Sequence, residues 1–132
     1  ICDLNIQNKY GSTALIRAAY KGHSESVQQL ITAGCDLNIQ EKGGWTALIF
    51  AAYKGHSESV QLLISAGCNF NIQNKIGWTA LMYTARWGRS ESVQQLITAG
   101  CDLNIQSKFG KTAKDYAAEH GHSEVLKMLE AK

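Results

Sequence analysis

The sequence lacks long apolar runs and a large net charge, and it is poor in charged residues. Its longest uninterrupted apolar stretch, Ala47 to Tyr53, is far shorter than the roughly 20 residues that a membrane-spanning helix needs. Charged residues make up only 18% of the chain and apolar residues 45%, which excludes a disordered tail. The net charge of +2 is too small to indicate a nucleic-acid or membrane partner by bulk electrostatics. We therefore expect a soluble protein, in which any charged partner meets a local patch.

Targeting signals are missing as well. The chain opens at Ile1 with no initiator methionine, no basic segment and no apolar signal core, which indicates an excised or processed piece rather than a targeted precursor. Its 132 residues are the size of one domain.

What the sequence does have is a strict period. Four cysteines follow one another at intervals of 33 residues, at Cys2, Cys35, Cys68 and Cys101. All glycines except Gly43 obey the same period, and because glycine reaches positive φ without strain, they mark three chain reversals in each full unit. We divide the chain into a partial repeat at 1–7, full repeats at 8–40, 41–73 and 74–106, and a shorter last repeat at 107–132.

Each unit has the pattern of two short helices. In the first full repeat, Thr13 stands as an N-cap before an alanine-rich helix that ends at Gly22. A second helix, from His23 to Ile31, carries an apolar stripe at i, i+3 and i+4, and Gly34 closes it. The polar segment that follows suits an extended finger between units. No unit can bury its stripe alone, so the units must stack.

The first helices carry a recurring motif. It reads Thr13-Ala14-Leu15-Ile16-Arg17-Ala18, then Thr46-Ala47-Leu48-Ile49-Phe50-Ala51, then Thr79-Ala80-Leu81-Met82-Tyr83-Thr84. These residues resemble the ankyrin repeat, whose period is 33 and whose pattern is a turn plus two helices with T-P-L-H-x-A. Alanine replaces the motif's proline throughout. The resemblance implies an all-α fold: one ankyrin-repeat domain over 1–132, a solenoid of helix-turn-helix units with β-turn fingers.

The two ends of the predicted stack differ. Lys114 and Asp115 in the last repeat replace the apolar pair Leu15 and Ile16, and they give the polar outer face that a terminal repeat needs. We interpret 107–132 as a C-terminal capping repeat. The first full repeat has the apolar helices of an internal one, so its N-terminal face is expected to be open. Either repeats are missing upstream or that face meets another chain.

Repeats 8–40 and 74–106 differ at only eight of 33 positions, all in the finger, the first helix and the start of the second. Such near-identity favours a recently duplicated or engineered array. In the ankyrin family, fingers and first helices line the concave surface that usually binds partners, so the resemblance implies that the varied half is the binding half. The replacements introduce Trp, Tyr and Arg, types that are enriched at interface hot spots.

We therefore predict a non-enzymatic protein–protein interaction module that displays its binding side chains rigidly on the concave surface. Packing between neighbouring fingers and first helices is the alternative role for any single ring. Trp78→Ala is expected to weaken binding with little loss of folding. The predicted partner-binding residues are Tyr10, Arg17, Tyr20, Lys21, Trp45, Phe50, Tyr53, Ile76, Trp78, Tyr83, Arg86 and Trp87.

We expect no catalysis, metal or cofactor. Equivalent cysteines in a stack lie roughly 10 Å apart, too far for a disulfide. Buried thiols favour the cytoplasm, another reducing compartment or recombinant expression. The repeated His23, His56 and His122 become Arg89 in the third repeat, which indicates a structural role at the start of the second helix. No glycine pattern matches a phosphate-binding loop.

Two other functions stay open. Finger lysines next to aromatic residues could serve a nucleic acid, although a protein partner with an acidic patch is the more economical interpretation. A structural array could instead self-associate through its uncapped N-terminal face. Asparagines after the second helices resemble those that cytosolic hydroxylases modify, and hydrogen bonding within the finger is the role we expect for them. The lysines are Lys9, Lys42, Lys75 and Lys108, and the asparagines are Asn38, Asn71 and Asn104.

Overall fold

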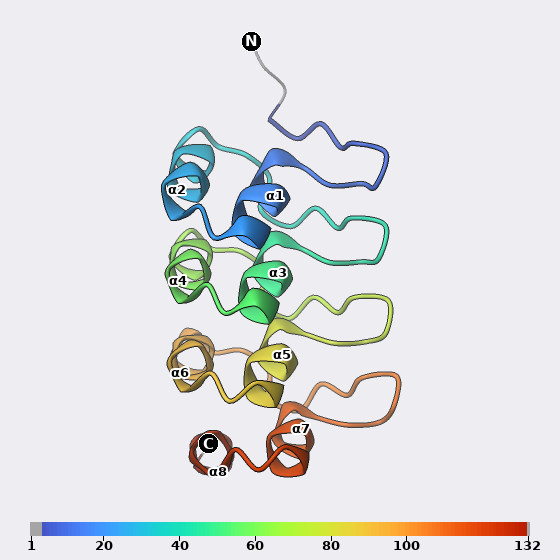
Figure 1. Ribbon diagram of the computed structural model, residues 1–132, viewed down its shortest axis with the longest axis vertical. Helices are drawn as coiled ribbons and strands as arrows, with labels where there is room; N and C mark the ends of the chain where they lie inside the picture. Colours follow the sequence, from blue (N-terminus) through green and yellow to red (C-terminus); the bar gives the residue numbers. More distant parts are fainter. Residues whose placement is uncertain (1–3, 132) are drawn as a thin grey trace.

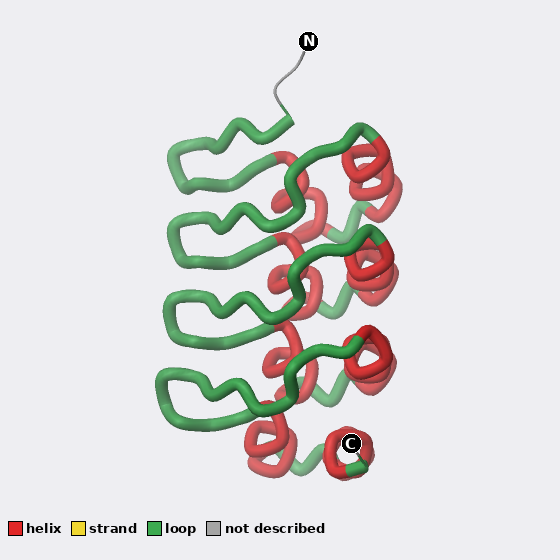
Figure 2. The backbone as a smooth tube through the Cα atoms, turned by 180° about the vertical axis from the view of Figure 1, so that it is seen from behind, coloured by secondary structure: helices red, strands yellow, loops and turns green. Residues whose placement is uncertain are grey.

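The computed structural model describes residues 4–131, which form eight helices and no strand. The helices stand in two parallel columns, odd-numbered and even-numbered, and the fingers all project to the same side beyond the odd column (Figure 1). The view from behind shows the same regular stack (Figure 2). One helix pair falls in each repeat unit. The helices are α1 (Ala14–Lys21), α2 (Ser24–Thr32), α3 (Ala47–Lys54), α4 (Ser57–Ser65), α5 (Ala80–Arg86), α6 (Ser90–Ala99), α7 (Ala113–Glu119) and α8 (Ser123–Glu130).

The odd-numbered helices begin at a threonine cap in every repeat. Thr13 Oγ1 accepts a hydrogen bond from the Ile16 backbone N–H at 3.2 Å, and Thr46, Thr79 and Thr112 repeat this bond. The cap satisfies a backbone N–H that the first turn leaves free. The helices therefore start at the predicted place without the motif's proline.

The second helices are shifted slightly from the prediction. The sequence predicted His23 to Ile31, whereas α2 runs from Ser24 to Thr32. His23 is the N-cap residue but makes no side-chain cap bond, so the histidine does something else at this position.

Two of the histidines at this position bond to the preceding repeat. The His56 Nε2 atom lies 3.1 Å from the Tyr20 carbonyl oxygen, and His122 Nε2 lies 2.7 Å from that of Arg86. Gly22 leaves room for the His56 ring, because a Cβ atom there would come within 2.7 Å of it. The predicted structural role is thus a contact between repeats.

The core is built from the same helix contacts in every repeat. α1 packs on α3, α3 on α5 and α5 on α7, while the even-numbered helices form a second set of contacts. Small side chains such as Ala19 and Ala52 are fully buried between the odd-numbered helices, which lets them approach closely. Leucine and valine from each repeat fill the space between the two columns, as at Leu48 and Val60.

Neighbouring fingers are joined by one backbone hydrogen bond each and by side-chain hydrogen bonds, with no strand among residues 4–131. The Lys42 N–H donates to the Tyr10 carbonyl at 3.0 Å, and one equivalent bond links each following pair of fingers. Gln40 Nε2 reaches both Gly44 O at 2.8 Å and Gln73 O at 3.2 Å. Asn38 Oδ1 accepts the Asn69 N–H at 2.8 Å. The Asn38 side chain therefore bonds to the next repeat, which corrects the prediction that it bonds within its own finger; there its backbone N–H donates to Asp36 Oδ1 at 2.9 Å.

The glycine turns predict unequal costs of substitution. Gly22 and Gly34 both have positive φ, of 78° and 88°, but no atom lies near a Cβ at Gly34. Gly34→Ala should cost roughly 1–2 kcal/mol of unfolding free energy through backbone strain alone. Gly22→Ala should cost about 3 kcal/mol, because the His56 ring must also move and lose its hydrogen bond with the Tyr20 carbonyl oxygen. Urea unfolding of both variants measures the difference, and equal costs would contradict the role given to His56.

Candidate functional site

A column of aromatic rings runs along the face made by the fingers and the odd-numbered helices, which we call the finger face. Phe50 stacks on Trp45 with ring centroids 4.7 Å apart, and Trp45 stacks on Tyr83 at 4.9 Å. Trp78 continues the column, 4.6 Å from Tyr83 and 4.1 Å from Tyr116. Fingers supply the tryptophans and helices supply the other rings, so each contact fixes a finger to a helix.

The predicted site residues fall into three groups by exposure. Trp78 and Tyr83 are buried, with 6% and 4% of their surface exposed. Trp45, Phe50 and Arg86 are half-buried. The exposed group consists of Tyr10, Arg17, Tyr20, Lys21, Tyr53, Ile76 and Trp87. Contact between any of these residues and a partner stays a prediction.

The burial of Trp78 corrects one expectation. Its indole is 6% exposed and packs between the rings of Tyr83 and Tyr116, so we expect its removal to cost folding stability. Packing, the alternative role, applies to this ring and to Tyr83.

A polar network fixes the buried tyrosines. Asn74 Nδ2 donates to the Tyr83 hydroxyl at 3.0 Å, while its Oδ1 accepts the backbone N–H of Trp78 at 2.9 Å. In the next repeat, Ser107 Oγ and the Tyr116 hydroxyl are 2.8 Å apart. Burial raises the pKa of the Tyr83 hydroxyl. These anchors match no motif predicted from the sequence, although Asn74 and Ser107 both stand nine residues before their tyrosine.

Arg86 is held by aromatic rings and lacks an ion-pair partner among residues 4–131. Its guanidinium lies 5.7 Å from the centroid of Trp78 and 5.0 Å from that of Trp87. It borders a hollow of about 430 Å³ that Phe109 and Lys111 also line. Lys111 pairs with Glu119, so the carboxylate in this hollow is already engaged.

The two halves of the repeats carry opposite charge. The fingers and first helices, at 8–22, 41–55, 74–88 and 107–121, hold ten of the 13 basic and three of the 11 acidic side chains. The rest of the sequence holds three basic and eight acidic ones, so net charges of +7 and −5 lie behind the overall +2. The finger face is therefore strongly basic although the protein as a whole is not.

A comparison with protein-family models identifies the family. The model described as ankyrin repeats (3 copies) matches residues 1–74 and again residues 57–132, and the two matches together span the whole sequence. The chain belongs to the ankyrin repeat family. A search of curated proteins returned no match. Ankyrin repeats generally mediate protein–protein interaction and are typically non-enzymatic.

Within residues 4–131, no three His, Cys, Asp or Glu side chains are grouped so that they could hold a metal ion. No helix in that range is long and apolar enough to cross a membrane. Cys35, Cys68 and Cys101 are buried free thiols, and Cys2 lies outside the described residues. Burial raises the pKa of Cys68 and of Cys101 to about 11.

The raised pKa values of Cys68 and Cys101 predict that these thiols react slowly with thiol reagents. At pH 8 a thiol of pKa about 11 is ionised to about one part in a thousand, roughly a hundredfold less than one near pKa 9. In a variant with both Cys2→Ser and Cys35→Ser, which keeps only Cys68 and Cys101, the native chain should react with a thiol reagent about a hundredfold more slowly than the urea-unfolded chain. The native rate should rise about tenfold per pH unit between 8 and 10, because the thiolate is the reactive form. Fast, pH-independent labelling would contradict this account.

The two groups of tryptophans predict different stabilities. Trp78→Ala should lower the unfolding free energy by about 3–5 kcal/mol, because it leaves a cavity between two tyrosines. Trp87→Ala should cost less than about 1 kcal/mol, since the side chain is 46% exposed and contacts chiefly Arg86. Urea unfolding compares them directly. If Trp78→Ala proved as stable as Trp87→Ala, the aromatic column would not be structural.

Proposed function

We propose that this ankyrin domain binds an acidic region of a partner protein through its finger face. The observation that carries the proposal is the excess of positive charge on the face where exposed rings also gather. Trp87, Tyr53 and Tyr20 are exposed there, and large aromatic side chains of this kind supply most of the energy at protein interfaces. The lysines and arginines around them favour a partner of opposite charge.

The fixed geometry of the face supports tight binding. Half-buried Trp45 is held between Phe50 and Tyr83, and its neighbour Tyr53 meets it edge-on at 5.2 Å. Arg86 is held against Trp87 in the same way. Side chains that are already ordered lose little conformational entropy on association. The stack therefore presents a preorganised surface rather than a loose one.

A protein is favoured over a nucleic acid by the state of the rings. Sequence-independent binding of single strands needs aromatic faces on which bases stack. Here Trp45 and Trp78 each have rings against both faces, so neither provides such a platform. Carboxylates, by contrast, suit the Arg86 guanidinium, which can bind them through two parallel hydrogen bonds.

The test uses exposed positions and the half-buried Arg86, and leaves the buried rings unchanged so that folding is preserved. A partner is captured with the parent domain, identified and purified, and its affinity for variants is measured. Trp87→Ala should weaken binding at least about fivefold, or about 1 kcal/mol, as expected of a hot spot. Arg86→Lys should also weaken binding, because it keeps the charge but loses the planar fork.

The matched control is Gln61→Ala, an exposed position on α4 in the other column. It should leave the affinity within about twofold. Lys42→Glu combined with Lys75→Glu should slow association far more than it speeds dissociation, since rim charges act chiefly on the rate of encounter. Equal affinities for Trp87→Ala and Gln61→Ala would contradict the proposed surface. A captured ligand that nuclease destroys would replace the protein partner with a nucleic acid.

A further inference from the structure

The hollow beside Arg86 lies on the finger face, between the third full repeat and the last one, and has a volume of about 430 Å³. Trp78 and Arg86 line it from the earlier repeat, while Phe109, Lys111 and Glu119 line it from the later one. Its walls therefore come from α5, from α7 and from the two fingers that precede these helices.

Two N–H groups at this hollow lack an acceptor. Arg86 Nε and Trp78 Nε1 are both buried without a hydrogen-bond partner among residues 4–131. The Arg86 guanidinium lies against the rings of Trp78 and Trp87 rather than against a carboxylate. Removing a cation from water without pairing it is unfavourable. An anionic acceptor in the hollow would compensate for this lost hydration.

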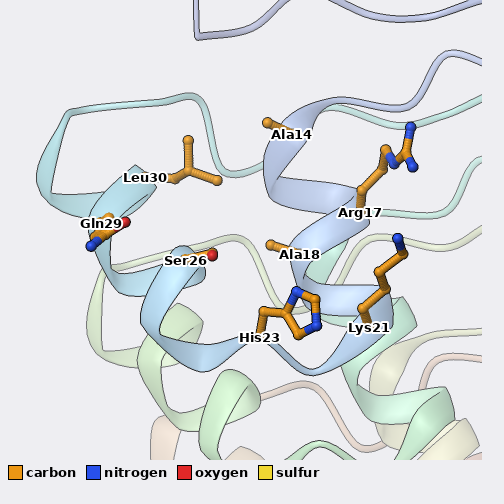
Figure 3. A pocket seen from close by; sticks show the side chains of 8 residues that line it. All are labelled: Ala14, Arg17, Ala18, Lys21, His23, Ser26, Gln29 and Leu30. Carbon is orange, nitrogen blue, oxygen red and sulfur yellow. The ribbon is translucent and has the colours of Figure 1, made fainter.

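Other cations of the finger face lack this environment. Arg17 and Lys21 of α1 are exposed, and they border a separate hollow of about 510 Å³ between α1 and α2. Figure 3 shows both side chains directed away from α2. Exposed cations gain little from pairing with a carboxylate, because water already hydrates them. Arg86 is half-buried and held by two rings, so a carboxylate paired with it is bound more strongly.

The carboxylate that belongs to the hollow is engaged elsewhere. Glu119 stands at the position of Arg86 one repeat later, and its Oε2 lies 2.5 Å from Lys111 Nζ. This pair leaves the Arg86 guanidinium without an ion pair among residues 4–131. Because 42% and 43% of the two side chains are exposed, the pair contributes little to folding stability. Glu119 can therefore be replaced without unfolding the domain.

We propose that the hollow binds one aspartate or glutamate side chain of the partner, and that a large apolar residue next to it in the partner's sequence covers Phe109. Phe109 is 67% exposed beside the hollow, so its ring offers the apolar contact that a single carboxylate does not provide. This proposal rests on the proposed function, because the acidic side chain belongs to the acidic region that the finger face binds.

A carboxylate suits the hollow better than a phosphate does. A phosphate group carries a charge of about −1.5 to −2 near neutral pH. The Glu119 carboxylate on the wall of the hollow repels this larger charge more strongly than it repels a single one. A carboxylate also matches the planar guanidinium with two parallel hydrogen bonds.

The experiment measures the binding of short synthetic peptides to the full chain. The probe is acetyl-Gly-Glu-Phe-Gly-amide, and two matched peptides replace its glutamate with glutamine or its phenylalanine with alanine. NMR titration follows the indole N–H signal of Trp78 and the side-chain Nε–H signal of Arg86. The probe should bind with a Kd of about 1 mM, as expected for a few contacts. The glutamine peptide should bind at least about tenfold more weakly, and the alanine peptide at least about threefold more weakly.

Variants of the face separate this hollow from the general charge. Arg86→Gln should remove the preference for the glutamate peptide over the glutamine peptide. Arg17→Gln takes the same charge from the same face and should keep that preference, since Arg17 does not line the hollow. Phe109→Ala should remove the preference for the phenylalanine peptide over the alanine peptide.

A gain in affinity provides a test that a folding defect cannot imitate. Glu119→Gln should strengthen binding of the glutamate peptide at least about threefold, because the hollow loses its own carboxylate and Lys111 is released. The matched control is Glu124→Gln, which removes a carboxylate from an exposed position on α8. It should change the Kd less than about twofold, since a distant exposed charge is screened.

Several results would overturn the proposal. These are no shift of either signal with the probe, equal binding of the probe and a matched peptide, a preference that Arg86→Gln keeps, and equal effects of Glu119→Gln and Glu124→Gln. Tighter binding of inorganic phosphate than of the probe would also overturn it. The proposed function would survive each of these results if the purified partner still lost affinity on Trp87→Ala and not on Gln61→Ala.

Discussion

The interface between successive repeats is the constraint on which the rest of this ankyrin domain depends. One helix pair has too little apolar surface to fold alone, and the buried alanines of the odd-numbered helices are useful only when a neighbour packs against them. The positions of the fingers follow from this packing, because each finger leaves one repeat and is tied to the next by a backbone bond and a glutamine side chain. The stack is therefore both the core and the frame of the finger face.

The fold was predictable because its signals are periodic. The threonine caps, the positive-φ glycines and the apolar stripes recur at one spacing. An ambiguous helix boundary in one repeat can therefore be assigned from the other repeats. The ring orientations were not predictable in the same way. Trp45 and Trp78 occupy the same finger position and each packs against the tyrosine of the following repeat, Tyr83 or Tyr116, yet Trp45 is half-buried and Trp78 is buried. The other neighbours of the two rings differ, with Tyr53 edge-on to Trp45 and Arg86 over Trp78, and a position-by-position comparison does not describe such contacts.

The basic character of the finger face is similarly hidden from the overall composition. A net charge of +2 describes a nearly neutral protein, but the fold puts the two halves of every repeat on different sides of the stack. Charges that alternate along the chain are thereby separated in space. Lysines from four fingers come to one side, while most carboxylates belong to the second helices and the segments after them. The stacking of the repeats thus produces the local basic patch that a charged partner would need on a protein of small net charge.

Variation between the repeats is limited by the same packing that creates the site. The change from Arg17 in the first repeat to Tyr83 in the third puts a phenol into the interior, and Asn74 satisfies its hydroxyl. The change to Thr84 at the position of Ala18 adds a buried hydroxyl, which bonds to the Leu81 carbonyl at 2.8 Å. An outward position such as Trp87, which is 46% exposed and lies against Arg86, changes without adding a buried side chain to the interior. Binding specificity on this frame therefore depends on the outward residues. The inward substitutions serve the packing and hydrogen bonding of the interior.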